Sequence, residues 1–402
     1  MVLPITVLTL TLGICFVAPA HAQNARRARA PLKEKTMRVH SLRVAGQWGA
    51  DISPDGNSVA VAVLRKVVAP ETNNEEAFVD VEIWDFRANK RMAQRTLEHR
   101  PASAPVTAEW GQVRYSGDGR VLLVYDGELL SVLQADTLEE ITRIDLGLPA
   151  WPRDSQVVDL AMPREAAREV AVLLSWGGGR GGAVRLYDLQ TGALGRQWEF
   201  DHGYPELGAR VAWKPDGRKL AVSLLPVVPG VQLPKDEKTL QVMDAESGKI
   251  LARINTGYLA GPICFTADDK LVTATAESGW TLVLGTHKIK IWNATSERLL
   301  REIESAPSGV RESLALSADG KRLLGYVGSE KATLNLSASD PTEILEQKFR
   351  LWDLPSGRIV TTSPKILPPA DKRAQLRLSA KGDFVLVFWN SVDKPVLVYE
   401  IE

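Results

Sequence analysis

The stretch that decides the fold is Ala212-Trp213-Lys214-Pro215-Asp216-Gly217-Arg218-Lys219-Leu220-Ala221-Val222-Ser223-Leu224. Pro215 presets the first corner of a turn, and Gly217 supplies the positive φ that completes it. Apolar and polar residues alternate beside the turn, which is typical of half-buried strands. The stretch therefore predicts two short antiparallel strands joined by a tight turn.

Two sequence marks recur along the chain and define repeats. Turns of the first mark begin at Ser53, Ser116, Lys214, Thr266, Ser317 and Ser379, with a degenerate copy at Arg164–Ala167. The second mark is a pair of residues, usually aromatic then acidic, found at Trp84-Asp85, Leu133-Gln134, Tyr187-Asp188, Met243-Asp244, Trp292-Asn293, Trp352-Asp353 and Tyr399-Glu400. Spacing ranges from 47 residues (Trp352 to Tyr399) to 63 residues (Ser53 to Ser116). Periods of this size indicate a repeat array or a propeller.

Each repeat reads as four short strands. The third strand carries the second mark, as in Val184–Asp188, and a turn such as Gln190–Gly192 leads to a fourth strand, as in Lys249–Ile254. One four-stranded sheet cannot bury both of its faces, whereas seven sheets packed radially can. The sequence therefore predicts an all-β fold, a seven-bladed β-propeller.

The two marks are out of phase at the chain ends. The last repeat stops on its third strand at residues 399–402, so seven third strands are followed by only six fourth strands. A strand-like segment, Thr36–Ser41, precedes the first turn. We therefore expect this N-terminal strand to complete the last blade, with Val39 paired to the strand that ends at Tyr399, and the propeller to span residues 37–402.

Together the two marks resemble those of WD40-repeat proteins and their bacterial YVTN-like relatives, over residues 37–402. The resemblance implies a β-propeller, a ring that serves scaffolds, lactonases and dehydrogenases alike. The sequence departs from the WD40 pattern in one respect. His99 and His202 lie where that family places a histidine, but their blades carry Leu133 and Met243 in place of the partner tryptophan. The resemblance thus implies an incomplete hydrogen-bond network there.

The composition restricts the class of partner. The chain has 49 basic and 49 acidic residues and no net charge, which argues against a general nucleic-acid binder. Basic residues gather in residues 23–36, which we interpret as a flexible basic tether. Because the repeats account for the rest of the mature chain, we expect one propeller domain despite its 402 residues.

Residues 1–22 resemble a secretory signal peptide. Val2–Ala20 is uncharged and largely apolar, and Ala20-His21-Ala22 fits a cleavage site before Gln23. No basic residue precedes the apolar run and three arginines follow it, which opposes the usual export orientation. An uncleaved membrane anchor or a misassigned start codon are the alternatives. We expect a periplasmic or secreted protein in which Cys264 is the one remaining cysteine.

The predicted loops divide between two faces of the ring. Turns between strands 1 and 2 and between strands 3 and 4 are short, whereas the insertions at 65–80, 225–238 and 328–347 fall on the opposite face. Long loops on a rigid scaffold often bind partners. Aromatic residues and arginines of this face are enriched types at binding hot spots. The binding candidates on this face are Arg100, Trp151, Arg153, Arg180, Tyr204, Tyr258, Arg311 and Arg373.

The sequence contains no recognisable catalytic motif. The histidines left after signal removal, His40, His99, His202 and His287, have no metal-ligand spacing, and no nucleophile elbow occurs. We expect no catalytic residue, metal or cofactor. The favoured hypothesis is a monomeric exported propeller that binds another protein or an envelope component, with no membrane span after cleavage. The alternative is a propeller enzyme of the lactonase or quinone-dependent dehydrogenase type with a site at the central opening.

Overall fold

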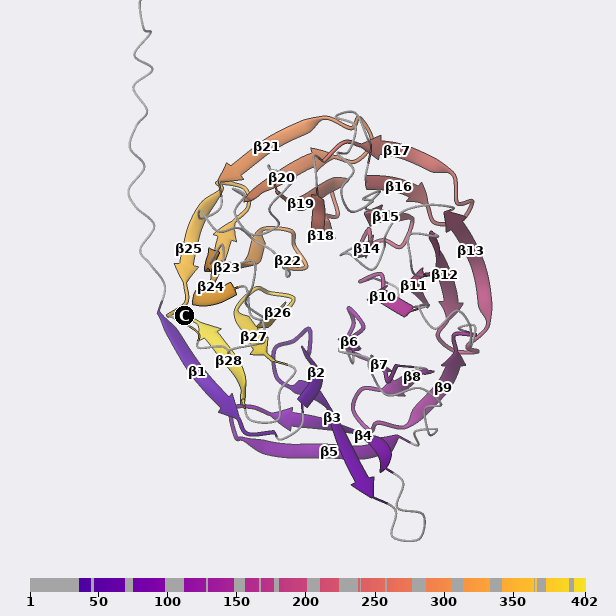
Figure 1. Ribbon diagram of the computed structural model, residues 1–402, viewed down its shortest axis with the longest axis vertical. Helices are drawn as coiled ribbons and strands as arrows, with labels where there is room; N and C mark the ends of the chain where they lie inside the picture. The colour runs from indigo at the N-terminus through magenta and orange to yellow at the C-terminus, as the bar shows by residue number, and fades with distance from the viewer. Residues whose placement is uncertain are drawn as a thin grey trace, which may run out of the picture. The chain divides into compact units, whose positions relative to one another are not determined.

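The computed structural model describes residues 36–44, 47–68, 75–97, 112–127, 129–147, 156–165, 168–176, 181–200, 210–223, 238, 240–256, 259–276, 287–304, 314–332, 342–364, 366, 374–389 and 394–402. Within these ranges the chain forms seven four-stranded sheets and no helix. The sheets are the blades of a β-propeller, and their innermost strands face a common axis (Figure 1). Residues 1–35, and with them the expected signal peptide and most of the tether, lie outside the described ranges.

Blades are numbered from the N-terminus, and each runs from an inner to an outer strand. Blades 1 to 3 comprise β2 (Gln47–Ile52), β3 (Val59–Val68), β4 (Glu75–Asp85) and β5 (Lys90–Leu97); β6 (Gln112–Tyr115), β7 (Val121–Tyr125), β8 (Leu129–Gln134) and β9 (Glu140–Asp145); and β10 (Gln156–Ala161), β11 (Glu169–Ser175), β12 (Gly182–Asp188) and β13 (Leu194–Phe200).

The remaining blades follow the same order, apart from the last. Blades 4 to 7 comprise β14 (Arg210–Trp213), β15 (Lys219–Ser223), β16 (Leu240–Asp244) and β17 (Ile250–Ile254); β18 (Leu259–Phe265), β19 (Lys270–Ala276), β20 (His287–Asn293) and β21 (Leu299–Glu304); β22 (Leu314–Leu316), β23 (Arg322–Ala332), β24 (Thr342–Asp353) and β25 (Arg358–Thr362); and β26 (Gln375–Leu378), β27 (Phe384–Phe388), β28 (Val396–Ile401) and β1 (Met37–Leu42).

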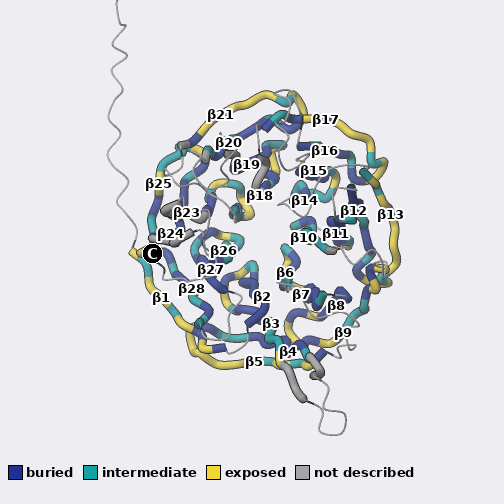
Figure 2. Tube along the Cα trace, in the orientation of Figure 1, coloured by how far each residue is buried: buried dark blue, intermediate teal, exposed yellow. Residues whose placement is uncertain are grey.

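The hydrophobic core lies between the blades. Alternate residues of one strand face opposite neighbours. In β3, Val59 and Val61 pack with Phe384 and Leu386 of blade 7, whereas Ala60 packs on the other side with blade 2. Seven such apolar clusters occur among the described residues, one between each pair of neighbouring blades. Outer strands are the most exposed (Figure 2). No blade has a core of its own, so the ring must close to be stable.

The N-terminal strand closes the ring, as predicted. β1 pairs antiparallel with β28, and Val39 lies opposite Tyr399. The pairing extends past the strand ends, because the amide of Glu402 donates to the carbonyl of Thr36 at 3.1 Å. Leu42 is fully buried between blades 7 and 1. Blade 7 is therefore held together by strands from both ends of the chain.

The short turns of both marks lie together on one face, which we call the turn face. In blade 4 the amide of Ala245, just after the second mark, donates to the carbonyl of Arg218, just after the first. Equivalent 2.7–2.9 Å bonds occur in blades 2, 3, 5 and 6. Gly217 has φ 73°, as the sequence predicted. The opposite side is the long-connection face.

The insertions at 65–80 and 328–347 were expected to be loops. The structure corrects this, because both ends of each insertion form paired strands. β3 and β4 stay paired out to Val68 and Glu75, and β23 and β24 stay paired out to Ala332 and Thr342. Each pair is a two-stranded ribbon that continues beyond the pairing with its blade neighbours. We name them ribbon 1 (65–68 with 75–78) and ribbon 6 (326–332 with 342–348). The expected insertion at 225–238 lies outside the described residues except for Lys238.

Candidate functional site

Five charged side chains gather on the innermost strands of five blades. We call them the inner-wall cluster: Asp51 on β2, Arg114 on β6, Asp159 on β10, Arg210 on β14 and Arg377 on β26. Each alternates with buried apolar residues of the same strand, such as Val113 and Leu376, which pack between blades. The cluster contains three guanidinium groups and two carboxylates, so positive charge is in excess.

Both carboxylates link neighbouring blades. Asp51 accepts from its neighbour Ile52 at 2.9 Å and from the amide of Tyr115, in blade 2, at 2.8 Å. Asp159 repeats this arrangement, accepting from Leu160 at 3.0 Å and from the amide of Val211, in blade 4, at 3.1 Å. Each oxygen of the two carboxylates therefore accepts a hydrogen bond from a backbone N–H. The two aspartates thus stabilise the contacts between neighbouring blades.

Two of the three guanidinium groups donate hydrogen bonds within their own strands. Arg114 donates to the carbonyl of Val113 at 3.0 Å, and Arg377 donates to the carbonyl of Leu376 at 2.9 Å. Nε of Arg377 lies 3.9 Å from Oδ1 of Asp51, and it is buried without a hydrogen-bond partner. The side chain of Arg377 is 18% exposed, so its charge is only partly hydrated.

Burial shifts the pKa values of this cluster. Desolvation raises the pKa of Asp51, although Arg377 and Arg114 oppose the shift. Desolvation, followed by repulsion from Arg114, lowers the pKa of Arg377 to about 9, with Asp51 and Asp159 opposing. Arg377 still carries its charge at neutral pH. The arrangement supplies fixed cationic donors rather than a group that transfers protons near pH 7.

The degenerate turn of blade 3 reaches across the ring. Arg164 donates to the carbonyl of Leu316, at the end of β22 in blade 6. The backbone of Arg164 also lies against Gly117 of blade 2, where an added Cβ would clash with the Arg164 carbonyl oxygen. Blades 3 and 6 lie on opposite sides of the axis, so Arg164 spans the turn-face end of the inner wall.

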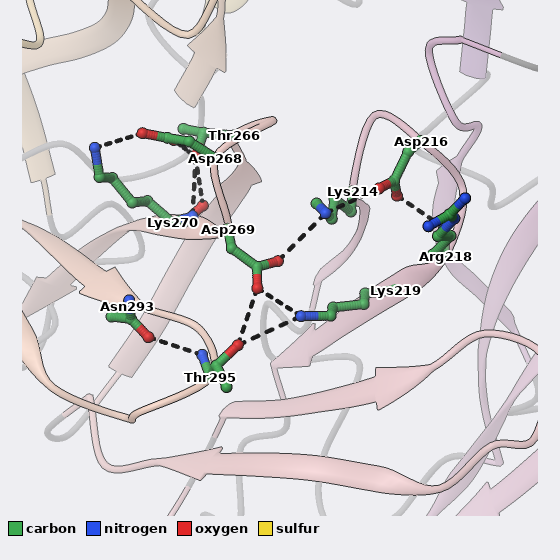
Figure 3. Close-up of polar contacts among 10 residues, drawn as sticks. All are labelled: Lys214, Asp216, Arg218, Lys219, Thr266, Asp268, Asp269, Lys270, Asn293 and Thr295. Carbon is green, nitrogen blue, oxygen red and sulfur yellow. Dashed lines mark hydrogen bonds and ion pairs between the residues drawn. The ribbon is translucent and has the colours of Figure 1, made fainter.

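A second charged network lies on the turn face between blades 4 and 5 (Figure 3). Asp269 has φ 64° at the position where most of the other turns have glycine. It accepts from Lys219 at 2.6 Å and from the Thr295 hydroxyl at 2.9 Å, and Lys214 lies 3.5 Å away. Burial alone would raise the pKa of Asp269, but these partners lower it overall. Because its charges pair within the network, we assign it a structural role.

Cys264 is unsuited to nucleophilic chemistry. Its thiol lies 3.6 Å from the carbonyl of Leu314 in blade 6, and burial raises its pKa to about 11. The thiol therefore stays protonated at neutral pH. Nor does any group of three or more His, Cys, Asp and Glu side chains with metal-binding geometry occur among the residues that the structure describes.

All eight binding candidates chosen from the sequence lie outside the described residues: Arg100, Trp151, Arg153, Arg180, Tyr204, Tyr258, Arg311 and Arg373. His99 and His202 also lie outside them. The inner-wall cluster was not among the residues predicted from the sequence, because its members lie on strands rather than in long loops and include no histidine. The sequence does contain a pattern that could have located three of its members. Asp51, Arg114 and Arg377 each lie two residues before the first-mark serine of their blade.

Comparisons with known proteins identify the fold. A chain in the crystal structure of the mitotic checkpoint complex, a WD40 propeller, matches with a TM-score of 0.55 and 16% sequence identity, over 98% of this chain and 99% of that chain. No protein-family model matches the sequence, and no curated protein is similar to it. This likeness concerns the fold alone: the protein is a seven-bladed β-propeller, similar in architecture to the propeller of that complex.

Proposed function

We propose that this propeller is a non-catalytic scaffold that binds a partner protein by its long-connection face. The observation that carries the proposal is the pair of ribbons. β2 pairs with β3 only as far as Val63, and β5 pairs with β4 only from Val79 onward. Residues of ribbon 1 therefore have one strand neighbour each in the described pairings. Such open edges can pair with an extended segment of another protein.

Ribbon 6 has the same property and is longer. β22 pairs with β23 as far as Gly325, and β25 pairs with β24 only from Arg350 onward. Blades 6 and 1 flank blade 7, so the two ribbons extend from either side of the closing blade on one face. Two edges on a rigid ring offer a partner two anchoring points, and the ring fixes their spacing.

Trimming the ribbons tests this proposal. In one variant an Asn-Gly turn replaces residues 329–346, joining the paired residues Gly328 and Gln347. In a second it replaces 66–77 between Arg65 and Phe78. Loop closure depends weakly on length, so we expect both variants to melt near the parent temperature. We also expect each to lose copurifying partners; retention of every partner by a variant trimmed at both ribbons would refute the proposal.

Export is a separate part of the proposal. It is supported by the apolar segment and the Ala20-His21-Ala22 pattern before Gln23. Mass spectrometry of the protein from its native source should find Gln23 as the first residue. A majority of molecules containing peptides that span Ala22 and Gln23 would favour the anchored alternative. The described residues contain no helix long and apolar enough to cross a membrane.

A further inference from the structure

Two neighbouring blades each present a pair of consecutive aliphatic residues on the outer rim of the ring. The pairs are Ile250-Leu251, at the start of β17 in blade 4, and Leu299-Leu300, at the start of β21 in blade 5. β17 and β21 are neighbouring outer strands (Figure 1). The four residues are between 37% and 46% exposed, and we call them the rim patch. Exposed apolar residues that occur together, rather than singly, mark contact surfaces.

A β-bulge brings both members of each pair to the surface. Ile250 and Ala252 face successive residues of β16, so Leu251 is an extra residue in β17, and Leu300 has the same place in β21. Consecutive side chains of a regular strand point to opposite faces, whereas a bulge re-aims them. The equivalent residues of the other bulged outer strands are not pairs of exposed aliphatic residues: Arg91-Met92, Glu140-Ile141, Leu194-Gly195 and Ile359-Val360, of which Val360 is buried.

Basic side chains flank the rim patch. Lys249 and Arg298 each precede one aliphatic pair, and Arg253 follows one along β17. All three are exposed, and their side chains form no ion pair with the residues that the structure describes. The nearby carboxylate of Glu297 is already occupied, since it accepts from the amide of Arg253 at 2.9 Å and from Lys238 at 2.9 Å. The first of these bonds also joins the two blades beside the patch.

We propose that the rim patch attaches the propeller to an anionic phospholipid surface. Aliphatic side chains insert at the boundary of the acyl chains, and flanking Lys and Arg side chains attract anionic headgroups. Cationic and aliphatic residues follow one another along both strands, and an anionic lipid surface complements both kinds. The exposed carboxylate of Glu246 opposes the attraction, but the three cations outnumber it. The patch contains no ribbon residue, so this proposal and the proposed function can fail separately.

Sedimentation with lipid vesicles tests the proposal, using protein purified from its native source so that its N-terminus is as processing leaves it. One set of vesicles contains phosphatidylcholine and phosphatidylglycerol in equal amounts, and the other contains phosphatidylcholine alone. We expect the parent protein to bind the anionic vesicles more tightly, and high salt to weaken this preference. Equal binding to the two sets, or binding to neither, overturns the proposal.

Two double variants locate the site. Leu251→Gln with Leu300→Gln removes one residue from each pair, and we expect it to weaken binding to the anionic vesicles about tenfold or more, because two inserted leucines are lost. Met92→Gln with Leu194→Gln is the matched control, since these residues are 54% and 48% exposed on the outer strands of blades 1 and 3. We expect the control to bind like the parent, and equal affinity of the two variants would overturn the proposal.

A second copy of the chain is the competing occupant of the rim patch. If the parent protein is a dimer without lipid, and Leu251→Gln with Leu300→Gln makes it monomeric, the lipid proposal is overturned. Should that variant not fold, Lys249→Gln with Arg298→Gln replaces it in the vesicle assay. We expect the replacement to lose most of the preference for anionic vesicles, and an unchanged preference would overturn the proposal.

Discussion

At the scale of single residues, the turn face depends on side chains that serve both the turn and the following strand. In the first turn the Ser53 hydroxyl donates to Asp55 at 2.6 Å and accepts from the amide of Ser58 at 2.9 Å. The turns beginning at Ser116 and Ser317 repeat both bonds. Glycine and proline predict these turns from the sequence, whereas the hydrogen bonds between serine and aspartate are seen only in the structure.

Because Gly217 has a positive φ, we expect substitution at this position to destabilise the fold. An added Cβ there meets no atom closer than 3.5 Å, so only backbone strain opposes it. Gly217→Ala should lower the free energy of unfolding by about 1–2 kcal/mol. Gly195→Ala is the control, since that residue does not have positive φ and an added Cβ would find ordinary contacts. Equal effects in denaturant unfolding would contradict the strain argument.

The turn aspartates predict sensitivity to acid. Hydrogen bonds outweigh burial and lower the pKa values of Asp55, Asp118 and Asp319. A lowered pKa gives stability that is complete above the unfolded-state value, ~3.9, and is lost as pH falls through the folded-state value. Melting temperature should therefore fall below about pH 4.

Ser317→Ala provides the control for this prediction, because it removes the hydroxyl that donates to ionised Asp319. The variant should melt at a lower temperature than the parent protein at pH 7. The difference between the two melting temperatures should become smaller in acid, where Asp319 is protonated. A difference that stays constant down to pH 2 would assign the effect to something other than the carboxylate.

At the scale of strands, the sequence allowed the register of β1 to be predicted but not the ribbons. Counting third and fourth strands left one outer strand missing, and only Thr36–Ser41 could supply it. Insertions such as 328–347 have no counterpart in the other repeats. Comparison of the repeats therefore could not predict that their ends form strands rather than loops. The inner-wall arginines were missed because their proximity depends on ring closure, which brings together residues as distant as Arg114 and Arg377.

The closing strand predicts a sharp difference between two truncations. A chain beginning at Thr36 keeps β1 and should melt like one beginning at Gln23. A chain beginning at Arg43 exposes the edge of β28, which pairs with β1 along its whole length. We expect that chain to aggregate and to be cut first in blade 7 by proteases. If both truncated chains melt and digest alike, β1 is not required for closure.

At the scale of the whole molecule, the ring separates structure from binding. The turn face joins blades through paired groups such as Asp269 and Lys219, whereas the long-connection face carries both ribbons. A rigid scaffold of this kind can change its partners through one face while its blade contacts stay fixed. Partner binding should therefore be insensitive to conservative changes on the turn face.

Site-specific photo-crosslinking in the organism that makes the protein would show whether a partner protein contacts the ribbons. The photoreactive residue is placed on ribbon 6, at Lys331 or Glu343, which are paired, and for comparison at Thr191 or Glu246, which are exposed on the turn face. We expect a discrete protein adduct from the ribbon positions and none from the turn face. Adducts formed only from Thr191 or Glu246 would contradict this expectation.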